Sequence, residues 1–397
     1  MRLSWYLFIL LFSLSINSHQ RSESYSNNII KNYDSFYTIS TNFTVQHSVL
    51  YKFDEFKNIS DIRDLQPYVL ERFRSYDNCL ITSDPLTANN KSAGYVNIQW
   101  DLKCEGLIPF IKNNTFFEQD SSHTHIATFK INGKSYPEKI FSFDSREWYE
   151  SGDKDKNIRN SSSSSVVDYI WLGIEHIISG LDHIAFLASI LLLRLGIRKT
   201  IFAITGFTIG HSITLILGSL KLIEPSSAFV ESAIGFSIML VSIEAISRAS
   251  NQYLFSLNTL ILFWLFTFLI YLVFSKNYHL IGLLGLSVFS LSYVALLLKN
   301  SMNFTILITS FFGLIHGFGF AGNLKEIGIN EDRILQALLG FNIGVEIGQL
   351  IILFFMTILW FLLKSLFRRN LYSLSIVFSS FLVALGGFWF LERLFIS

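Results

Sequence analysis

The chain has 397 residues, a formal net charge of +1 and a hydrophobic content of 51%. This near-neutral charge gives no electrostatic reason to expect nucleic acid as a partner. The charges are unevenly distributed, because residues 1–165 hold 37 of the 61 Asp, Glu, Lys and Arg residues and residues 166–397 hold the other 24. The composition therefore predicts a polar N-terminal domain followed by a helical membrane domain.

The first residues are typical of a secretory signal, and we predict a signal peptide at residues 1–18. Arg2 precedes Trp5–Ile16, an apolar stretch of 12 residues that is short for a spanning helix, and an uncleaved anchor is the alternative. Either interpretation exports the residues that follow. Because Cys79 and Cys104 are the two cysteines of the chain, export predicts a disulfide between them, with two free buried thiols as the alternative.

Residues 19–149 are predicted to form an exported β-rich domain with a sandwich-like fold. Apolar residues at helical spacing predict one helix within 61–75. His123 and His125 would share one face of a strand, where they either bind metal or lie on a solvated strand edge, which we favour. Residues 150–165 include five consecutive serines and are predicted to be a polar, flexible linker. Alternating and β-branched runs predict strands at 37–49, 95–102, 125–131 and 139–143.

Residues 166–397 are predicted to be a transmembrane helical domain. Its apolar segments are each close to or above the roughly 20 residues that a spanning helix needs, which predicts about 7–8 spanning helices. If the N-terminal domain is outside, the inner loops carry more Lys and Arg residues than the outer loops and the C-terminus. Arg393 is counted among the outer charges. The predicted fold class is a polytopic α-helical membrane bundle preceded by an exported β-rich domain. The apolar segments are 166–195, 200–220, 229–247, 254–275, 280–298, 303–321, 335–363 and 372–395.

Four histidines and two carboxylates lie deep within these apolar segments. Ionisable groups inside a bilayer are costly and usually serve function. His176 and His183 are seven residues apart, so on a straight helix they share one face at a separation of about 10.5 Å. Either they serve successive sites, or Gly180 allows a bend, or other helices complete each site. The other deep groups are Asp182, His211, His316 and Glu346.

Neighbouring polar residues are expected to support these groups. Asn342, Glu346 and Gln349 fall at i, i+4 and i+7 and predict one polar helix face, with Gly344 and Gly348 on the opposing packing face. Imidazoles with a few carboxylates and amides suit nickel, cobalt or zinc, whereas calcium or magnesium prefers an all-oxygen site. The further supporting residues are Glu175 and Ser212.

Four stretches of the chain resemble the HupE/UreJ family of membrane proteins. The resemblance covers the membrane half, and its His-x5-Asp-His pattern is similar to the motif of nickel/cobalt permeases. It implies uptake of a divalent metal, with His176, Asp182 and His183 as ligands in the first helix and with His211, His316 and Glu346 completing the path. The stretches are Gly173-Ile-Glu-His-Ile-Ile-Ser-Gly-Leu-Asp-His183, Phe207-Thr-Ile-Gly-His-Ser-Ile-Thr214, Gly313-Leu-Ile-His-Gly-Phe-Gly-Phe-Ala321 and Phe341-Asn-Ile-Gly-Val-Glu-Ile-Gly-Gln349.

The leading functional prediction is a permease or uptake accessory protein for nickel or cobalt, with the ion as substrate and no catalytic residues. Its expected partners are the lipid bilayer, the metal ion, and a metallochaperone or a metalloenzyme maturation partner. The expected location is the bacterial inner membrane.

The alternative prediction is an intramembrane zinc-dependent hydrolase. His183, His211 and His316 would hold the zinc, Asp182 or Glu346 would be the base, and Ser212 would orient the reacting group. A third possibility is an accessory or sensor protein whose exported domain captures metal or a partner.

Overall fold

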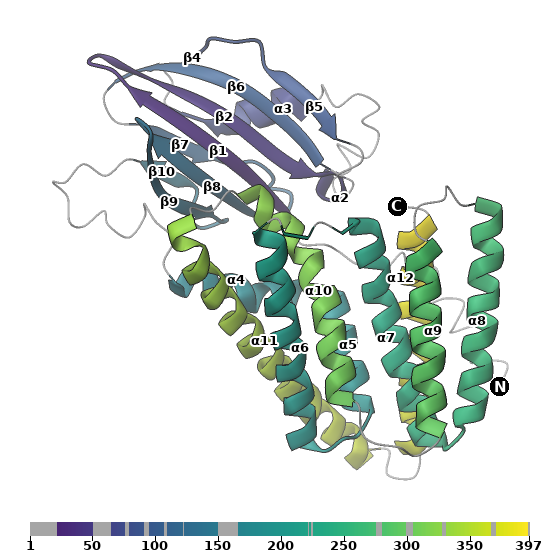
Figure 1. The fold of residues 1–397 in the computed structure, drawn as a ribbon. Coiled ribbons are helices and arrows are strands. Elements are labelled where there is room, and N and C mark those ends of the chain that lie inside the picture. The colour runs from purple at the N-terminus through teal and green to yellow at the C-terminus, as the bar shows by residue number, and fades with distance from the viewer. Residues whose placement is uncertain are drawn as a thin grey trace.

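The computed structural model describes residues 22–50, 65–75, 79–90, 95–106, 109–121, 123–149, 166–220, 222–223, 225–274, 280–298, 305–327, 331–366 and 371–395. The predicted signal peptide at residues 1–18 and the predicted linker at 150–165 lie outside these residues. Within the described ranges, strands and two short helices occupy the first part of the chain, and long helices occupy the part after residue 165 (Figure 1).

The N-terminal β domain consists of a seven-stranded and a three-stranded sheet. Its elements are β1 (Glu23–Asn32), β2 (Phe36–Gln46), α2 (His47–Leu50), α3 (Leu65–Arg72), β3 (Phe73–Arg74), β4 (Cys79–Ile81), β5 (Leu86–Asn90), β6 (Tyr95–Glu105), β7 (Phe110–Asn113), β8 (Thr124–Ile131), β9 (Lys134–Phe141) and β10 (Glu147–Tyr149). The larger sheet has the order β4-β6-β2-β1-β8-β9 with β5 beside β6, and the smaller has the order β10-β7-β3. Residues of both sheets, including Trp100 and Trp148, share one apolar core.

Most of the predicted elements of the β domain are confirmed. The four predicted strands correspond to β2, β6, β8 and β9, and the Cys79–Cys104 disulfide joins β4 to β6. The predicted helix at 61–75 is shorter, because α3 ends at Arg72 and β3 follows. β1 was not predicted, since its sequence is largely polar; it pairs in parallel with β8 and antiparallel with β2.

His123 and His125 form a buried hydrogen-bonded chain with the serines of β1 and the residue before it. Ser24 Oγ lies 2.8 Å from His123 Nε2 and 2.7 Å from His125 Nδ1. The Ser22 hydroxyl lies 2.6 Å from His123 Nδ1, and the Ser26 hydroxyl lies 2.9 Å from His125 Nε2. Both histidines are at most 1% exposed, so both interpretations of this pair, a metal site and a solvated strand edge, are wrong. The imidazoles are instead satisfied in the interior.

We expect the β domain to lose stability as the pH falls. Burial lowers the pKa of His125 from 6.5 to about 3. Between these values the unfolded chain binds a proton that the folded domain excludes, so stability is complete above about pH 6.5 and decreases toward pH 3. At pH 5 the loss amounts to about 2 kcal/mol. Thermal unfolding at pH 7.5 and pH 5 measures it. If the His125→Gln variant loses as much stability between pH 7.5 and pH 5 as the wild type, His125 is not the cause of the loss.

The helical domain contains α4 (Val166–Ser179), α5 (Leu181–Leu192), α6 (Ile197–Ser219), α7 (Ser227–Ser250), α8 (Tyr253–Phe274), α9 (Leu280–Leu298), α10 (Thr305–Ile327), α11 (Glu331–Leu366) and α12 (Leu371–Phe395). Six described helices are long and apolar enough to cross a membrane, or seven if the bent pair α4–α5 is one span. α10 is not among them, because its apolar part, Thr305–Gly319, is shorter. The structure therefore supports six or seven spans, and the eighth is not confirmed.

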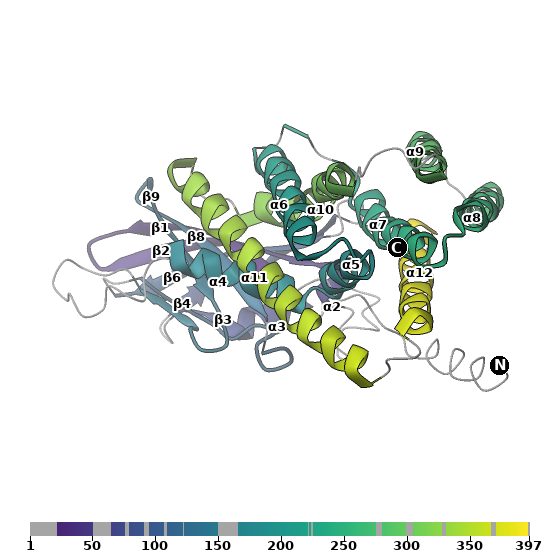
Figure 2. The ribbon, with the colours of Figure 1, turned by 90° about the horizontal axis from the view of Figure 1, so that it is seen from below.

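The β domain rests against one end of this bundle, over α4, α10 and α11 (Figure 1). Tyr25 and Ile126, on neighbouring strands, share an apolar cluster with Tyr169 of α4. The hydroxyl of Tyr169 donates a hydrogen bond to the buried carboxylate of Glu138 in β9. In the view from below, α7, α8, α9 and α12 lie on the side away from the β domain (Figure 2).

Three pairs of helices pack backbone to backbone through glycines: α4 with α11, α6 with α10, and α7 with α12. A Cβ atom added to Gly173 would lie 2.1 Å from the carbonyl oxygen of Phe341, and one added to Gly313 would lie 2.0 Å from that of Phe207. Such distances require glycine, and small residues are the usual means of close helix approach in membranes. The predicted packing role of Gly344 is confirmed, since its Cβ would lie 2.0 Å from a carbonyl oxygen of α4.

These contacts reveal an inverted repeat. Successive passes through the bundle alternate in direction (Figure 1), so α4 runs opposite to α10, α6 opposite to α11 and α7 opposite to α12. The matching stretches are Gly173-Ile-Glu-His176 with Gly313-Leu-Ile-His316, Phe207-Thr-Ile-Gly210 with Phe341-Asn-Ile-Gly344, and Ala233-Ile-Gly235 with Ala384-Leu-Gly386. Their contacts match as well: a Cβ on Gly235 would lie 2.8 Å from the nitrogen of Phe390, and one on Gly386 2.7 Å from that of Met239. Inverted repeats commonly place a binding site between the two units.

Candidate metal centre

The first apolar segment is broken at Gly180. α4 and α5 meet there at an angle of 72°. Gly180 has a φ of −81° and a ψ of 102°, which any residue can adopt. A Cβ atom on Gly180, however, would lie 2.5 Å from Nδ1 of His183. The glycine therefore provides space for the His183 ring, and of the possibilities considered for this helix the bend is confirmed.

The bend brings the four deep histidines into one group of contacting rings. The ring centroids of His176 and His183 are 4.8 Å apart, far closer than the straight-helix expectation of about 10.5 Å. His183 contacts His316 at 5.7 Å, and His176 approaches His211 at 6.5 Å. α4, α5, α6 and α10 each contribute one ring. Two members of the group, His176 and His316, are equivalent positions of the inverted repeat.

Several imidazole nitrogens of this group are buried without hydrogen bonds. Among the described residues, both ring nitrogens of His211, and Nε2 of His183 and of His316, have no hydrogen-bond partner. His316 Nδ1 lies 2.9 Å from the carbonyl oxygen of Phe312. A carbonyl oxygen only accepts, so Nδ1 carries the proton and Nε2 presents its lone pair. A buried polar atom without a partner costs about 1–3 kcal/mol, which a bound cation would relieve.

Asp182 connects the group to α12. Its Oδ1 lies 3.1 Å from His183 Nδ1, and its Oδ2 lies 3.8 Å from a guanidinium nitrogen of Arg393. Arg393 is 8% exposed and also donates to the carbonyl oxygen of Glu231 at 2.8 Å. From the sequence we predicted an outer charge at Arg393, and the structure instead places it beside Asp182. An arginine in the last turn of an apolar helix, one turn after Trp389, was the available signal.

Glu346 and Gln349 lie at the contact of α11 with α6. The Thr205 hydroxyl donates to Glu346 Oε1 at 2.7 Å, and the Thr208 hydroxyl donates to Gln349 Oε1 at 2.9 Å. Asn342 donates to the backbone carbonyl oxygen of Leu338 at 2.8 Å. These residues form the predicted polar face, but their recorded bonds are to α6 and to backbone, not to the imidazoles.

The two remaining predicted supporting residues are Ser212 and Glu175. Ser212 donates to the carbonyl oxygen of Thr208 at 2.7 Å, so it bonds within its own helix. Glu175 lies half-buried on α4 beside His176. An orienting role of Ser212 toward a histidine has no support in this arrangement.

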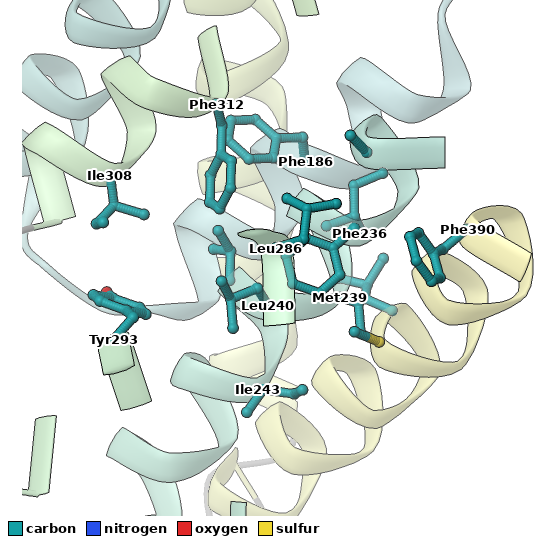
Figure 3. Close-up of a cluster of buried hydrophobic side chains, with 14 of the residues drawn as sticks. Phe186, Phe236, Met239, Leu240, Ile243, Leu286, Tyr293, Ile308, Phe312 and Phe390 are labelled. Carbon is teal, nitrogen blue, oxygen red and sulfur yellow. The ribbon is translucent and has the colours of Figure 1, made fainter. Parts of the chain in front are cut away.

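Aromatic residues form the walls of the imidazole group. Phe207 contacts His316 at 4.8 Å, and Phe341 contacts His176 at 5.4 Å. Phe186 contacts His316 at 5.2 Å and belongs with Phe312 to the apolar core that continues toward α7 and α12 (Figure 3). An apolar surrounding excludes water and strengthens electrostatic interactions within the group.

The rings are close, but their nitrogens do not converge on one point. Among the described residues, no three His, Cys, Asp or Glu side chains are arranged to hold a metal ion. Metal–nitrogen bonds of about 2 Å place two imidazole centroids on one tetrahedral ion roughly 5 Å apart. The separations of 4.8 and 5.7 Å are near that value, so side-chain rotations rather than helix movements separate this arrangement from a binding one.

The helices and the buried polar group define a polytopic membrane protein with a histidine-lined interior. Comparison with protein families matches the HupE / UreJ protein family over residues 153–269 and 267–393. These regions cover more than half of the chain, and each contains one unit of the inverted repeat. The chain belongs to the HupE/UreJ family. No curated protein matches it significantly.

Proposed function

We propose that this protein is a membrane permease for a divalent transition-metal ion, nickel or cobalt. The observation that carries the proposal is the group of four imidazoles from four helices, several of whose nitrogens are buried without a hydrogen-bond partner among the described residues. Neutral imidazole is a preferred ligand of borderline divalent metals. Membership of the HupE/UreJ family supports the same class of substrate.

The chemistry of the group favours transient binding over permanent binding. His176, His183, His211 and His316 offer ligands that must rotate to converge, because no metal-binding arrangement exists among the described residues. A conduction path needs sites that bind and release. Asp182 holds His183 and provides negative charge, while Arg393 neutralises that charge in the absence of metal. No observation favours a zinc hydrolase, since three converging histidines and a free Ser212 would be required.

In this proposal the β domain is exported and lies over the outer end of the bundle, through its contacts with α4 and α10. The bilayer is that of a bacterial inner membrane, and the ion is passed to a metallochaperone or a metalloenzyme maturation partner inside. The inverted repeat supports a carrier in which the site is reached alternately from either side.

We expect His176→Ala and Asp182→Asn each to reduce nickel or cobalt accumulation at least about tenfold in cells that express the protein. The measurement is uptake of each ion at equal amounts of membrane-inserted protein. Gly285→Ala, at a position with open space around it, is the matched control and should transport normally. Unchanged accumulation of both ions in both site variants would exclude this function.

A further inference from the structure

We propose that α6 and α11 form a second site, which binds a monovalent hard cation, Na⁺. The group consists of Glu346, Asn342 and Gln349 of α11 with Thr205 and Thr208 of α6. Its side chains offer carboxylate, amide and hydroxyl oxygens, and such donors suit hard cations rather than nickel or cobalt. The site is thus chemically distinct from the imidazole group.

The orphaned atoms of this group are oxygens. Glu346 Oε2 and Asn342 Oδ1 are both buried and have no hydrogen-bond partner among the described residues. The two residues are four apart on α11, so their side chains are neighbours on one face. An oxygen without a donor presents a lone pair, which a cation can use and an anion cannot. Both atoms therefore indicate an acceptor-lined position for a cation.

Charge balance selects a monovalent ion. The one polar contact of the Glu346 carboxylate among the described residues is the Thr205 hydroxyl, which donates to Oε1. An isolated carboxylate inside a membrane domain is costly unless a positive charge compensates it. Glu346 supplies one negative charge, and the other four side chains are neutral, so one monovalent cation neutralises the group.

A bound proton is the competing occupant of these atoms. The Thr205 hydroxyl already donates to Oε1, so a proton on the carboxyl group would sit on Oε2 and donate to the amide oxygen of Asn342. Na⁺ instead contacts both oxygens as a shared ligand pair. Only Na⁺ binding makes the stability of the protein depend on the salt at constant pH.

The inverted repeat shows that the carboxylate and amide oxygens are confined to α11. Glu346 of α11 corresponds to Ser212 of α6, and Gln349 corresponds to Leu215. In the other direction, His211 of α6 corresponds to Val345. At this contact α6 therefore carries the imidazole and two hydroxyls, and α11 carries the carboxylate and amide oxygens. Along α6, His211 lies six residues (about 9 Å) from Thr205 and three residues (about 4.5 Å) from Thr208, so the two groups adjoin.

If the protein is the metal permease proposed above, this Na⁺ is the ion whose gradient drives uptake. The binding site itself does not depend on that function, so it is tested first by binding. The test uses the purified full-length protein with chelator present, so that transition metals are absent. Thermal stability is compared in NaCl, LiCl, KCl and choline chloride at constant ionic strength.

We expect NaCl to raise the Tm of the wild type by roughly 5 °C over choline chloride, saturating with concentration. Glu346→Gln, which keeps the shape and removes the charge, and Thr205→Val should abolish this shift. Glu147→Gln, a surface carboxylate paired with Lys112 in the β domain, should keep it. Equal Tm in NaCl and choline chloride, a wild-type Tm that responds to pH alone, or a shift that survives in Glu346→Gln would each overturn the site.

The outcomes separate the two proposals. Loss of the Na⁺ shift in Glu346→Gln without any nickel or cobalt uptake by the wild type would leave the site in place and remove the permease. Uptake that depends on His176 but not on Na⁺, together with a wild-type Tm that is equal in all salts, would leave the permease and remove the site.

Discussion

Gly313→Ala is expected to destabilise the helical domain by about 3 kcal/mol or more, although it adds a single methyl group. The new Cβ would lie 2.0 Å from the carbonyl oxygen and 2.8 Å from the carbonyl carbon of Phe207. These are backbone atoms of α6, so no side-chain rotation can relieve the clash, and α6 and α10 must separate. Gly173→Ala should have a similar effect, because Gly173 meets Phe341 in the same way.

The measurement is the Tm and the monodispersity of the full-length protein in detergent. Gly285→Ala is the matched control, since Gly285 lies in α9 with nothing within 4 Å of the added Cβ. There the substitution should be neutral or stabilising by up to about 1 kcal/mol, because alanine favours helix more than glycine. A Tm of the Gly313→Ala variant equal to that of the wild type would show that α6 and α10 pack less closely than these distances indicate.

The inverted repeat also explains which parts of the fold were predictable. The apolar segments and the strands have strong local patterns, and their positions are confirmed. The close pairing of α4 with α11 and α6 with α10 depends on glycines far apart in the sequence. It becomes visible only when Gly173-Ile-Glu-His176 is compared with Gly313-Leu-Ile-His316. Such a comparison would also have identified His176 and His316 as equivalent positions.

The candidate site was predictable in its residues but not in its geometry. Histidines inside apolar segments are rare enough to identify themselves, and the four rings do contact one another. The bend at Gly180 could only be considered as one possibility, because its backbone angles are ordinary and the need for glycine arises from the position of His183.

Residues outside the apolar pattern were predicted less well. Arg393 was predicted to be an outer charge, since an arginine in the last turn of an apolar helix is unusual but does not show that α12 packs beside Asp182. β1 was missed for a related reason. Its serines are polar, yet they lie buried, because His125 of β8 and His123, the residue before β8, bond to them.

Gly180→Ala is expected to leave the protein folded while reducing metal uptake at least about tenfold. The backbone at Gly180 accepts alanine, since φ is −81° and ψ is 102°. The added Cβ would meet Nδ1 of His183 at 2.5 Å, the carbonyl oxygen of His176 at 3.1 Å and Oδ1 of Asp182 at 3.2 Å. The tightest contact is with a side chain, so the His183 ring can rotate away, and the His176 carbonyl needs to shift only slightly. That rotation relieves the clash but moves a ligand, and misplaced ligands lose binding far more than folding energy.

This substitution separates the site from the scaffold, which the variants of Gly313 and Gly173 cannot do. The Tm of Gly180→Ala should lie within a few degrees of the wild type, while accumulation of nickel and cobalt falls. The Na⁺-dependent shift in Tm should remain, because none of the atoms that the added Cβ would meet belongs to Glu346 or Thr205. Normal uptake by Gly180→Ala would mean that His183 does not bind the ion in this orientation, and the imidazole group would then have to function through His176, His211 and His316.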